Sequence, residues 1–194
     1  MIFGLGLWFL LAGYIIMFAF LVIQRLLRRT ESSKTFRRGA SDRGSTLLIG
    51  FALGIGLWLP LVLDVLGTEP FHIDLAEGLA AAAVMLFGLA LRIWAATTLG
   101  GLYTRTLMVT ENHRVVDSGP YSRIRHPAYL GVILLWSGFG VLSSNIVIAL
   151  AFPFVFVAVY LYRISVEENM LVRELGDAYV QYQRRTHRLI PFLY

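Results

Sequence analysis

Five long apolar runs restrict what this chain can fold into more than any other feature of its sequence. They lie at residues 2–23, 47–63, 79–99, 127–142 and 146–162. A helix rises about 1.5 Å per residue, so each of the first three runs can cross most or all of a hydrocarbon core about 30 Å thick. Lipid offers no partners for backbone N–H and C=O groups, and an α-helix satisfies these groups within its own segment. The sequence therefore predicts an all-α integral membrane protein with five transmembrane helices.

The composition agrees with a membrane protein and excludes several kinds of site. Hydrophobic residues make up 57% and charged residues only 15% of the 194 residues, whereas about a quarter of the residues in soluble domains are charged. The absence of cysteine excludes disulfides, thiolate metal sites and thiol catalysis. The histidines lack the spacing of metal ligands, so no metal site is expected. They are His72, His113, His126 and His187.

The distribution of positive charge predicts the topology. Every lysine and arginine except Arg92 falls in residues 25–43, 105–125 or 163–188, while residues 64–77 carry acidic side chains and no lysine or arginine. Cytoplasmic loops of membrane proteins are enriched in lysine and arginine, so we expect the three basic segments and the carboxyl terminus inside and the amino terminus outside. Arg92 is expected to extend to the cytoplasmic headgroups, with a role in a polar cavity as the alternative. Because the arginines flank apolar runs, membrane lipids rather than nucleic acid are the expected partners.

Two features of the first two apolar runs bear on the fold. A secretory signal peptide is the alternative for residues 2–23, but no positive region precedes the run and its apolar part is too long. In the second run, Gly50, Gly54 and Gly56 give a small-residue spacing (Gly50-x-x-x-Gly54) that permits close helix approach. We therefore expect both runs to be packed transmembrane helices.

Turn-forming residues divide the last apolar stretch into two legs. Ser143, Ser144 and Asn145 separate residues 127–142 from residues 146–162, and such residues favour a tight helical hairpin over one long helix. Each leg would reach about 24 to 26 Å at 1.5 Å per residue. The hairpin therefore either spans with little tilt or stops short of the far interface.

A charged tail, residues 163–194, follows the hairpin. Apolar residues recur in it at spacings of four, four and three, which predicts a C-terminal amphipathic helix that continues from the last span. Gly176 lies inside this pattern as a mild defect where the helix can bend. The stripe consists of Leu171, Leu175, Tyr179 and Tyr182.

The polar segment 119–131 is the strongest candidate for a functional site. It places prolines, arginines, tyrosines and a histidine beside an apolar run, although charge and irregular backbone next to lipid need partners within the protein. A hairpin returns the chain to the face that it left. Arg125 and His126 should therefore lie near Arg163 and Glu167.

The residue types at this site leave two interpretations open. Arg163 and Glu167 are four apart and share a helix face. They form either a surface ion pair, worth about 0.3 kcal/mol, or a clamp in which the arginine holds a carboxylate and the glutamate an ammonium or ribose hydroxyl. His126 is either a helix-entry residue before Pro127 or a donor to a bound ligand.

Several motifs occur in order over roughly the last ninety residues of the chain. They are Gly119-Pro-Tyr121, Arg125-His126-Pro127-x-Tyr129-x-Gly131, Glu167-Glu168-x-x-Leu171, Gly176-x-x-Tyr179-x-x-Tyr182 and Arg188-x-Ile190-Pro191. Their order and spacing resemble the isoprenylcysteine carboxyl methyltransferase family, in particular its small archaeal and prokaryotic five-span members. Leu175 is a departure, since family members commonly carry phenylalanine there.

This resemblance implies an S-adenosylmethionine-dependent methyltransferase that acts on the carboxylate of a lipid-linked, isoprenylcysteine-like substrate at the cytoplasmic face. It also implies one domain over residues 1–194, with three N-terminal spans in 1–99 and a cofactor loop, the hairpin and a catalytic tail in 100–194. Arg163 would be catalytic and bind the substrate, and Glu167 would be catalytic and bind the cofactor. The other implied cofactor-binding residues are His113, Arg114, Val115, Val116, Tyr121, His126, Pro127, Ala128 and Tyr129.

The implied chemistry suits the residue types, and three alternatives remain. A carboxylate is already a nucleophile at neutral pH, so methyl transfer needs alignment and exclusion of water rather than a strong base or a metal. A phospholipid N-methyltransferase has a similar tail, but its amine acceptor must lose a proton and would be repelled by Arg163. An NADPH-dependent membrane sterol reductase usually has more spans, and a non-enzymatic membrane protein leaves the clustered polar residues unexplained. No obligate protein partner is expected.

Overall fold

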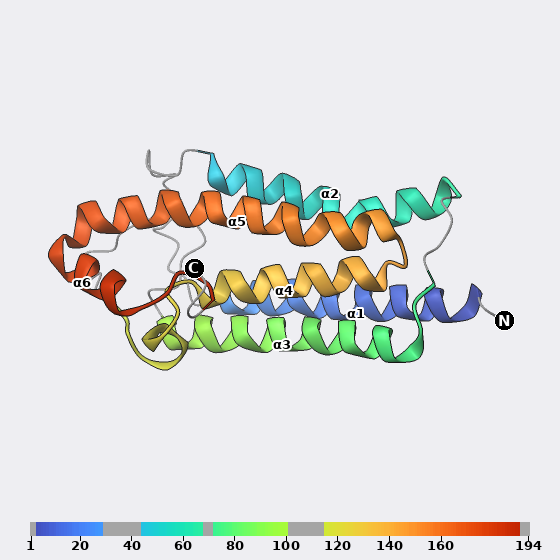
Figure 1. Cartoon of the computed structure of the whole chain (residues 1–194), viewed down its shortest axis with the longest axis horizontal. Helices are drawn as coiled ribbons and strands as arrows, with labels where there is room; N and C mark the ends of the chain where they lie inside the picture. The colour runs from blue at the N-terminus through green and yellow to red at the C-terminus, as the bar shows by residue number, and fades with distance from the viewer. Residues whose placement is uncertain (1–2, 29–43, 68–71, 101–114, 191–194) are drawn as a thin grey trace.

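The computed structural model describes residues 3–28, 44–67, 72–100 and 115–190, and these residues are almost entirely helical (Figure 1). Four helices are long and apolar enough to cross a membrane, namely α1, α2, α3 and α5, while α4 is apolar but shorter. The prediction of an all-helical integral membrane protein is confirmed, with four candidate spans where five were expected. The helices are α1 (Phe3–Arg28), α2 (Ser45–Val65), α3 (Leu75–Leu99), the 3-10 helix η4 (Gly119–Ser122), α4 (Pro127–Leu142), α5 (Ile146–Leu175) and α6 (Asp177–Arg185).

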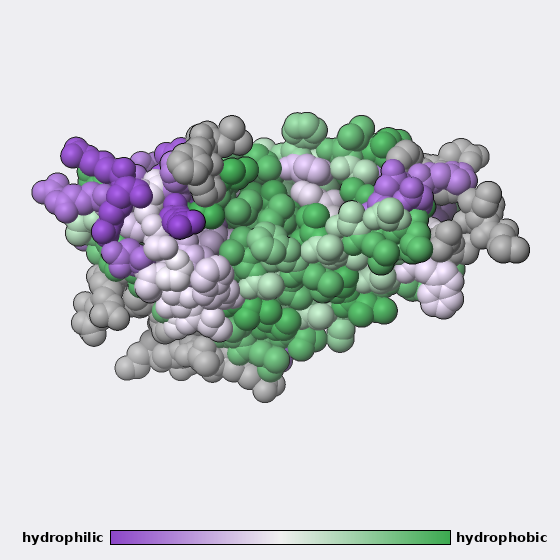
Figure 2. Space-filling model, turned by 60° about the horizontal axis from the view of Figure 1, so that its bottom comes forward, coloured by the Kyte–Doolittle hydropathy of each residue, from purple (hydrophilic) through white to green (hydrophobic). Residues whose placement is uncertain are grey.

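The long helices run along a common axis. Helix α4 packs against both α3 and α5, α2 packs on α5, and α1 packs on α3 and α4 (Figure 1). On the face that Figure 2 shows, hydrophobic residues cover the middle of the molecule and hydrophilic residues gather towards its two ends. The carboxyl end of the long helix α5 extends past its neighbours and carries α6 (Figure 1). We call the part formed by residues 115–129 and 163–190 the polar end.

Aromatic side chains fill the space between α4 and α5. Trp136 stacks on Phe156 with ring centroids 4.6 Å apart, and Phe139 and Phe152 pack edge-on or tilted beside them. All four side chains are buried. Large buried aromatic rings contribute both apolar area and favourable ring geometry, so this cluster ties the two helices together.

The turn between α4 and α5 has a clear local cause. Ser144 adopts a left-handed backbone conformation with φ of 54°, and the Asn145 side chain accepts from the backbone N–H groups of Val147 and Ile148 at 3.0 and 3.2 Å. Asparagine is a favoured N-cap because it satisfies otherwise unpaired N–H groups in this way. The chain therefore reverses within three residues, and α5 runs back along α4 (Figure 1).

Backbone contact between α3 and α4 depends on glycine. A methyl group added at Gly131 would lie 2.5 Å from the carbonyl oxygen of Gly88, and one at Gly138 would lie 2.6 Å from that of Ala81. By contrast, an added methyl group at Gly50 or Gly54 meets no atom within 4 Å. The expectation of close helix approach in α2 is therefore wrong at Gly50 and Gly54 for the described residues. It is right at Gly56, where an added methyl group would lie 2.7 Å from the Trp136 ring. Backbone-to-backbone approach is made by α3 and α4.

Gly176 divides the predicted C-terminal helix in two. Its φ of 55° is readily available only to glycine, and it ends α5 and begins α6. The apolar stripe predicted on one continuous helix is therefore wrong. Leu171 and Leu175 lie on α5, whereas Tyr179 and Tyr182 lie on α6 and are buried.

Arg92 contacts two neighbouring helices. Its Nη1 donates to the carbonyl oxygen of Ala128 at 3.1 Å, and its guanidinium lies 5.6 Å from the ring centre of Phe20. The side chain thus contacts the start of α4 and a ring of α1, because a carbonyl in the first turn of α4 and an aromatic face are both within reach. That it extends to the cytoplasmic headgroups stays a prediction.

The glycine contacts predict that Gly131→Ala and Gly50→Ala have opposite effects. Gly131→Ala forces α3 and α4 apart, and overpacking of this kind costs about 1–3 kcal/mol. Gly50→Ala adds a methyl group in open space and improves helix propensity by up to about 1 kcal/mol. Thermal unfolding of the detergent-purified variants should show a lower midpoint for Gly131→Ala only. Equal midpoints would contradict the backbone contact.

Candidate active site

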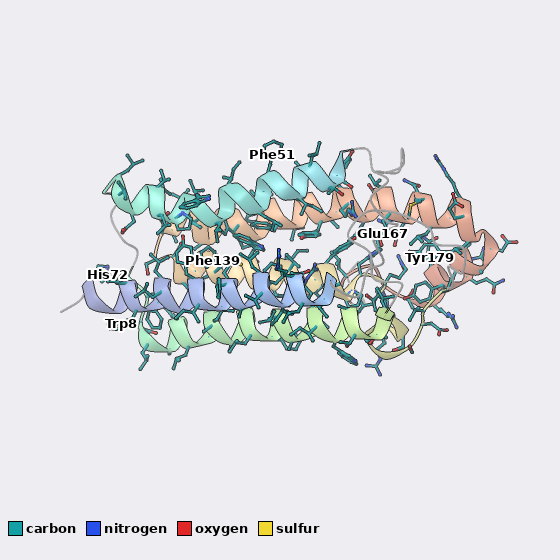
Figure 3. All side chains as sticks on the ribbon, turned by 180° about the vertical axis from the view of Figure 1, so that it is seen from behind. Trp8, Phe51, His72, Phe139, Glu167 and Tyr179 are labelled. Carbon is teal, nitrogen blue, oxygen red and sulfur yellow. The ribbon has the colours of Figure 1, made fainter. Side chains whose placement is uncertain are left out.

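Three segments distant in sequence meet at the polar end. The N–H of Arg125 donates to the carbonyl of His187 at 2.8 Å, and the N–H of His187 donates to the carbonyl of Arg123 at 2.9 Å. The N–H of His126 also donates to the carbonyl of Arg188 at 3.1 Å. This short parallel pairing lays the C-terminal tail against the segment that enters α4. Glu167 of α5 and Tyr179 of α6 lie at this end, opposite His72 and Trp8 (Figure 3).

Glu168 is the centre of the charge network at the polar end. Its Oε1 accepts from Nε of Arg125 at 2.7 Å and lies 3.2 Å from Nε2 of His126. Its Oε2 accepts from Nε of Arg188 at 2.9 Å and from Nε2 of Gln183 at 3.3 Å. The carboxylate is only 4% exposed, and a buried charge of this kind is stable only with close, hydrogen-bonded partners. Glu168 therefore joins α5, the entry to α4 and the tail after α6.

A second chain of contacts links Arg163 to Glu167 through Tyr129. The Nε of Arg163 donates to the Tyr129 hydroxyl at 3.3 Å, and this hydroxyl donates to Oε2 of Glu167 at 2.5 Å. Arg163 is 2% exposed, so the surface ion pair considered from the sequence is wrong for this arginine. The two charged groups share a helix face as predicted, with the phenol of α4 between them.

Arg163 also contacts the beginning of α2. Its Nη1 donates to the hydroxyl oxygens of Ser45 at 2.7 Å and Thr46 at 3.0 Å. Ser45 is 1% exposed. The first turn of α2, far away in sequence, therefore forms part of the surroundings of this guanidinium.

Aromatic rings fix the position of Tyr129. Its ring lies nearly parallel to that of His126 with centroids 5.5 Å apart and packs at a tilt against Tyr160 with centroids 5.1 Å apart. His126 is buried and lies between this ring and Glu168. The prediction that Arg125 and His126 lie near the face of Arg163 and Glu167 is confirmed, although their direct carboxylate partner is Glu168.

Tyrosines of α6 lie against the segment that precedes α4. The hydroxyl of Tyr182 donates to the backbone carbonyl of Tyr121 at 2.7 Å, and Tyr121 packs with Ala95 and Ala128. Burial, followed by the negative charge of Glu168, raises the pKa of Tyr179 well above its usual range, and burial also raises the pKa of Tyr182. Both phenols therefore stay neutral; both are buried, and Tyr182 is a hydrogen-bond donor.

The structure places most of the predicted site residues at this end. Pro127, Ala128 and Tyr129 form the first turn of α4, and Val116 packs beside Tyr121. Val115 is half-buried. The predicted contacts of His113 and Arg114 lie outside the described residues. The cofactor and substrate roles of the whole set stay predictions.

Sequence reasoning missed Glu168, Ser45 and Thr46. The signal for Glu168 was the Glu167-Glu168 pair, of which only the first member was assigned a role. Ser45 and Thr46 carried no signal, because hydroxyl residues before an apolar run read as an ordinary helix start. Within the described residues, no group of three histidine, aspartate or glutamate side chains could hold a metal ion.

The part of the chain that contains most of this site matches a known protein family. Residues 81–173 match the sequence model of the Isoprenylcysteine carboxyl methyltransferase (ICMT) family. The resemblance to the ICMT family is confirmed. The matched stretch contains most of α3 and all of η4 and α4, together with α5 as far as Arg173. Arg163, Tyr129 and both glutamates thus lie within the stretch that matches this family model.

Three relatives show how far the ICMT resemblance extends. The chain is 34% identical over 113 residues to protein-S-isoprenylcysteine O-methyltransferase B of Arabidopsis thaliana, covering 57% of each protein. It is 35% identical over 83 residues to the Schizosaccharomyces pombe protein-S-isoprenylcysteine O-methyltransferase, covering 43% of this chain and 35% of that protein. It is also 27% identical over 147 residues to the cobalt-zinc-cadmium resistance protein CzcN of Cupriavidus metallidurans, covering 72% of this chain and 64% of that protein. The chain thus spans between about a third and two thirds of the length of these relatives.

A solved structure shares the fold. The eukaryotic intramembrane Ras methyltransferase ICMT superposes with a TM-score of 0.62 at 20% identity, covering 97% of this chain and 72% of that one. The fold similarity therefore includes α1 and α2, which the family sequence match does not reach.

Glu168→Gln is predicted to destabilise the polar end. The amide keeps the shape of the side chain but leaves the buried guanidinium of Arg125 without its counter-charge. Breaking a buried pair in this way costs about 3 kcal/mol, which corresponds to roughly 6–12 °C in a protein of this size. Thermal unfolding in detergent measures the effect.

Glu174→Gln is the matched control, because Glu174 is an exposed residue of the same helix. Its unfolding midpoint should stay within about 1 °C of the wild-type value, as for most exposed substitutions. An unchanged midpoint for Glu168→Gln would contradict the role of Glu168 as the centre of the network.

Proposed function

We propose that this protein transfers a methyl group from S-adenosylmethionine to the carboxylate of a lipid-linked, isoprenylcysteine-like substrate. The observation that carries the proposal is the buried guanidinium of Arg163, linked through Tyr129 to Glu167 at the polar end of a membrane bundle. This arrangement lies in the sequence that matches the ICMT family. It combines one fixed cation and one carboxylate at the place where lipid and water meet.

The available charges fit the two ligands. A guanidinium pairs well with a carboxylate, and burial strengthens the pairing because little water competes. Glu167 is only half-buried, so its carboxylate suits the ammonium of a water-soluble amino-acid group. We assign Arg163 to the substrate carboxylate and Glu167 to the amino-acid end of the cofactor. His113, Arg114, Val115, Val116, Tyr121, His126, Pro127, Ala128 and Tyr129 complete the proposed cofactor site.

The residues of the chain orient the acceptor carboxylate and the cofactor and exclude water from them. They do not need to take up a proton. When bound, S-adenosylmethionine supplies a methyl group on a sulfonium, whose sulfur keeps the bonding electrons as the carboxylate oxygen takes the methyl carbon. Arg163 holds the attacking carboxylate in one orientation, and Tyr129 keeps the arginine at a fixed distance from Glu167. Alignment and exclusion of water supply much of the rate of such a transfer.

The acceptor class follows from the sign of the buried charge. An amine headgroup reaches the site as a cation, which Arg163 opposes. A carboxylate reaches it as an anion, which Arg163 attracts. The geometry therefore favours carboxyl methylation over lipid N-methylation.

We further propose that α4 is the fifth membrane crossing and that the polar end faces the cytoplasm. Helix α4 has 16 residues, which corresponds to about 24 Å, and it lies between α3 and α5. Basic residues such as Arg184 and Arg188 gather at the polar end, and Asp74 and Glu77 lie at the other end, where they form the capping box of α3. This asymmetry agrees with an outside amino terminus.

Arg163→Lys is predicted to abolish most turnover. Lysine keeps the positive charge but loses the planar donor arrangement that meets Tyr129, Ser45 and a carboxylate together. We expect kcat/KM for a farnesylated cysteine analogue to fall about 100-fold or more. Binding of S-adenosylhomocysteine, measured by calorimetry, should change by less than about threefold.

Arg173→Lys is the control for this experiment, since Arg173 is exposed on the same helix. It should retain wild-type turnover. Wild-type turnover in Arg163→Lys would remove Arg163 from the substrate site. Calorimetric binding of NADPH without binding of S-adenosylhomocysteine would overturn the proposed function itself.

Glu167→Gln is predicted to weaken the cofactor site selectively. Loss of one charge-assisted hydrogen bond to an ammonium should raise the Kd for S-adenosylhomocysteine about 10- to 100-fold. Glu174→Gln again provides the control, with an unchanged Kd. An unaltered Kd in Glu167→Gln would place the amino-acid end of the cofactor elsewhere.

A further inference from the structure

We propose that Ser45 and Thr46, in the first turn of α2, are positioning residues that fix the guanidinium of Arg163 for the acceptor carboxylate. This inference rests on the proposed function and extends it to a part of the chain that has no assigned role. The family sequence match begins at residue 81, so it contains neither hydroxyl.

The contacts constrain the guanidinium at two separate nitrogens. Ser45 and Thr46 accept from Nη1 at 2.7 and 3.0 Å, and Tyr129 accepts from Nε at 3.3 Å. Because the guanidinium is planar and its donors form a rigid fork, holding Nε and Nη1 fixes the plane of the whole group. The orientation offered to a carboxylate is then determined by residues from both α2 and α4.

The choice of hydroxyl groups has an electrostatic consequence. The beginning of a helix carries a partial positive charge, which disfavours a cation there. Neutral hydroxyl oxygens accept from Arg163 without cancelling its charge, whereas a carboxylate in their place would neutralise it. Ser45 and Thr46 thus hold the arginine beside the positive end of α2 without themselves adding a counter-charge.

Other contacts hold α2 in place without these hydroxyls. Gly56 and Pro60 of α2 are buried, and a methyl group added at Gly56 would lie 2.7 Å from the Trp136 ring and 3.3 Å from that of Phe156. The Tyr14 hydroxyl also donates to the carbonyl of Leu57 at 2.8 Å. Removal of the two hydroxyls should therefore move Arg163 more than it moves α2.

The test uses the full-length protein in detergent, with methylation of a farnesylated cysteine analogue as the readout. The variants are S45A/T46V, Thr46→Ser and Ser165→Ala. Ser165 is a matched control, because it lies on α5 two residues after Arg163, is exposed, and donates to the carbonyl of Tyr162 in its own turn.

We expect S45A/T46V to lower kcat/KM for the acceptor about 10- to 100-fold, mainly through KM, since a less ordered arginine binds a carboxylate less well. The Kd for S-adenosylhomocysteine should stay within about twofold of wild type, because Glu167 is not altered. Thr46→Ser keeps the hydroxyl and should behave like wild type, as should Ser165→Ala. In an Arg163→Lys background, S45A/T46V should lower kcat/KM by less than about a further threefold. Both changes act through the side chain at position 163, so their effects should not add.

Three outcomes overturn the inference. One is a wild-type kcat/KM in S45A/T46V. Another is that S45A/T46V lowers kcat/KM by the same factor in the Arg163→Lys background as in the wild-type protein. The third is a parallel loss of acceptor turnover and S-adenosylhomocysteine binding, which would indicate a general structural defect. A wild-type protein that binds S-adenosylhomocysteine yet methylates no carboxylate analogue would instead overturn the proposed function, and this inference with it.

Discussion

The buried carboxylate of Glu168 is the interaction on which the polar end depends. It lies on α5, but its partners come from the entry to α4, from α6 and from the tail that follows α6. A single charge with four close polar neighbours is stable in a desolvated place only while all of these segments stay together. The backbone pairing of residues 123–126 with residues 187–188 reinforces the same arrangement. Formation of the site is therefore coupled to folding of the C-terminal tail.

The two adjacent glutamates of α5 have separate tasks because they face different neighbours. Glu168 is buried among arginines and a histidine, and these contacts occupy its two oxygens. Glu167 is more exposed and accepts from the phenol of Tyr129. The contacts described for Arg163 are with hydroxyl groups from α2 and α4. The structural charge and the proposed functional charges thus lie side by side without pairing directly with one another.

Hydrophobic periodicity and charge placement predicted the helices well, because both are local properties of the sequence. Helix α4 was predicted with the bounds that the structure shows, since Pro127 and Ser143 mark its two ends. Because the chain was predicted to reverse at Ser143–Asn145, His126 was also predicted correctly to lie near Arg163 and Glu167 of α5. Local pattern marked Gly176 as a place where the helix can bend but could not show that it adopts a positive φ and ends the helix, so one apolar stripe was predicted across it.

Long-range contacts could not be predicted from one sequence, and Ser45 shows why. It is separated from Arg163 by most of the chain, and a serine at the start of a helix has an ordinary local explanation. Only the packing of α2 on α5 reveals that its hydroxyl meets a buried cation. The same holds for Gly50 and Gly54, whose spacing suits helix contact although a methyl group added at either would meet no atom of the described residues within 4 Å.

Contacts from two directions support the position of Tyr129 in the proposed site. On one side, Gly131, half a turn after Tyr129, packs against the backbone of Gly88 and holds α4 against α3. Arg92 also donates to the carbonyl of Ala128, the residue before Tyr129. On the other side, the stacked ring of His126 is held by Glu168. A phenol supported in this way can keep Arg163 and Glu167 at a constant separation. A preorganised pair of this kind loses little conformational freedom when an acceptor and a cofactor meet there.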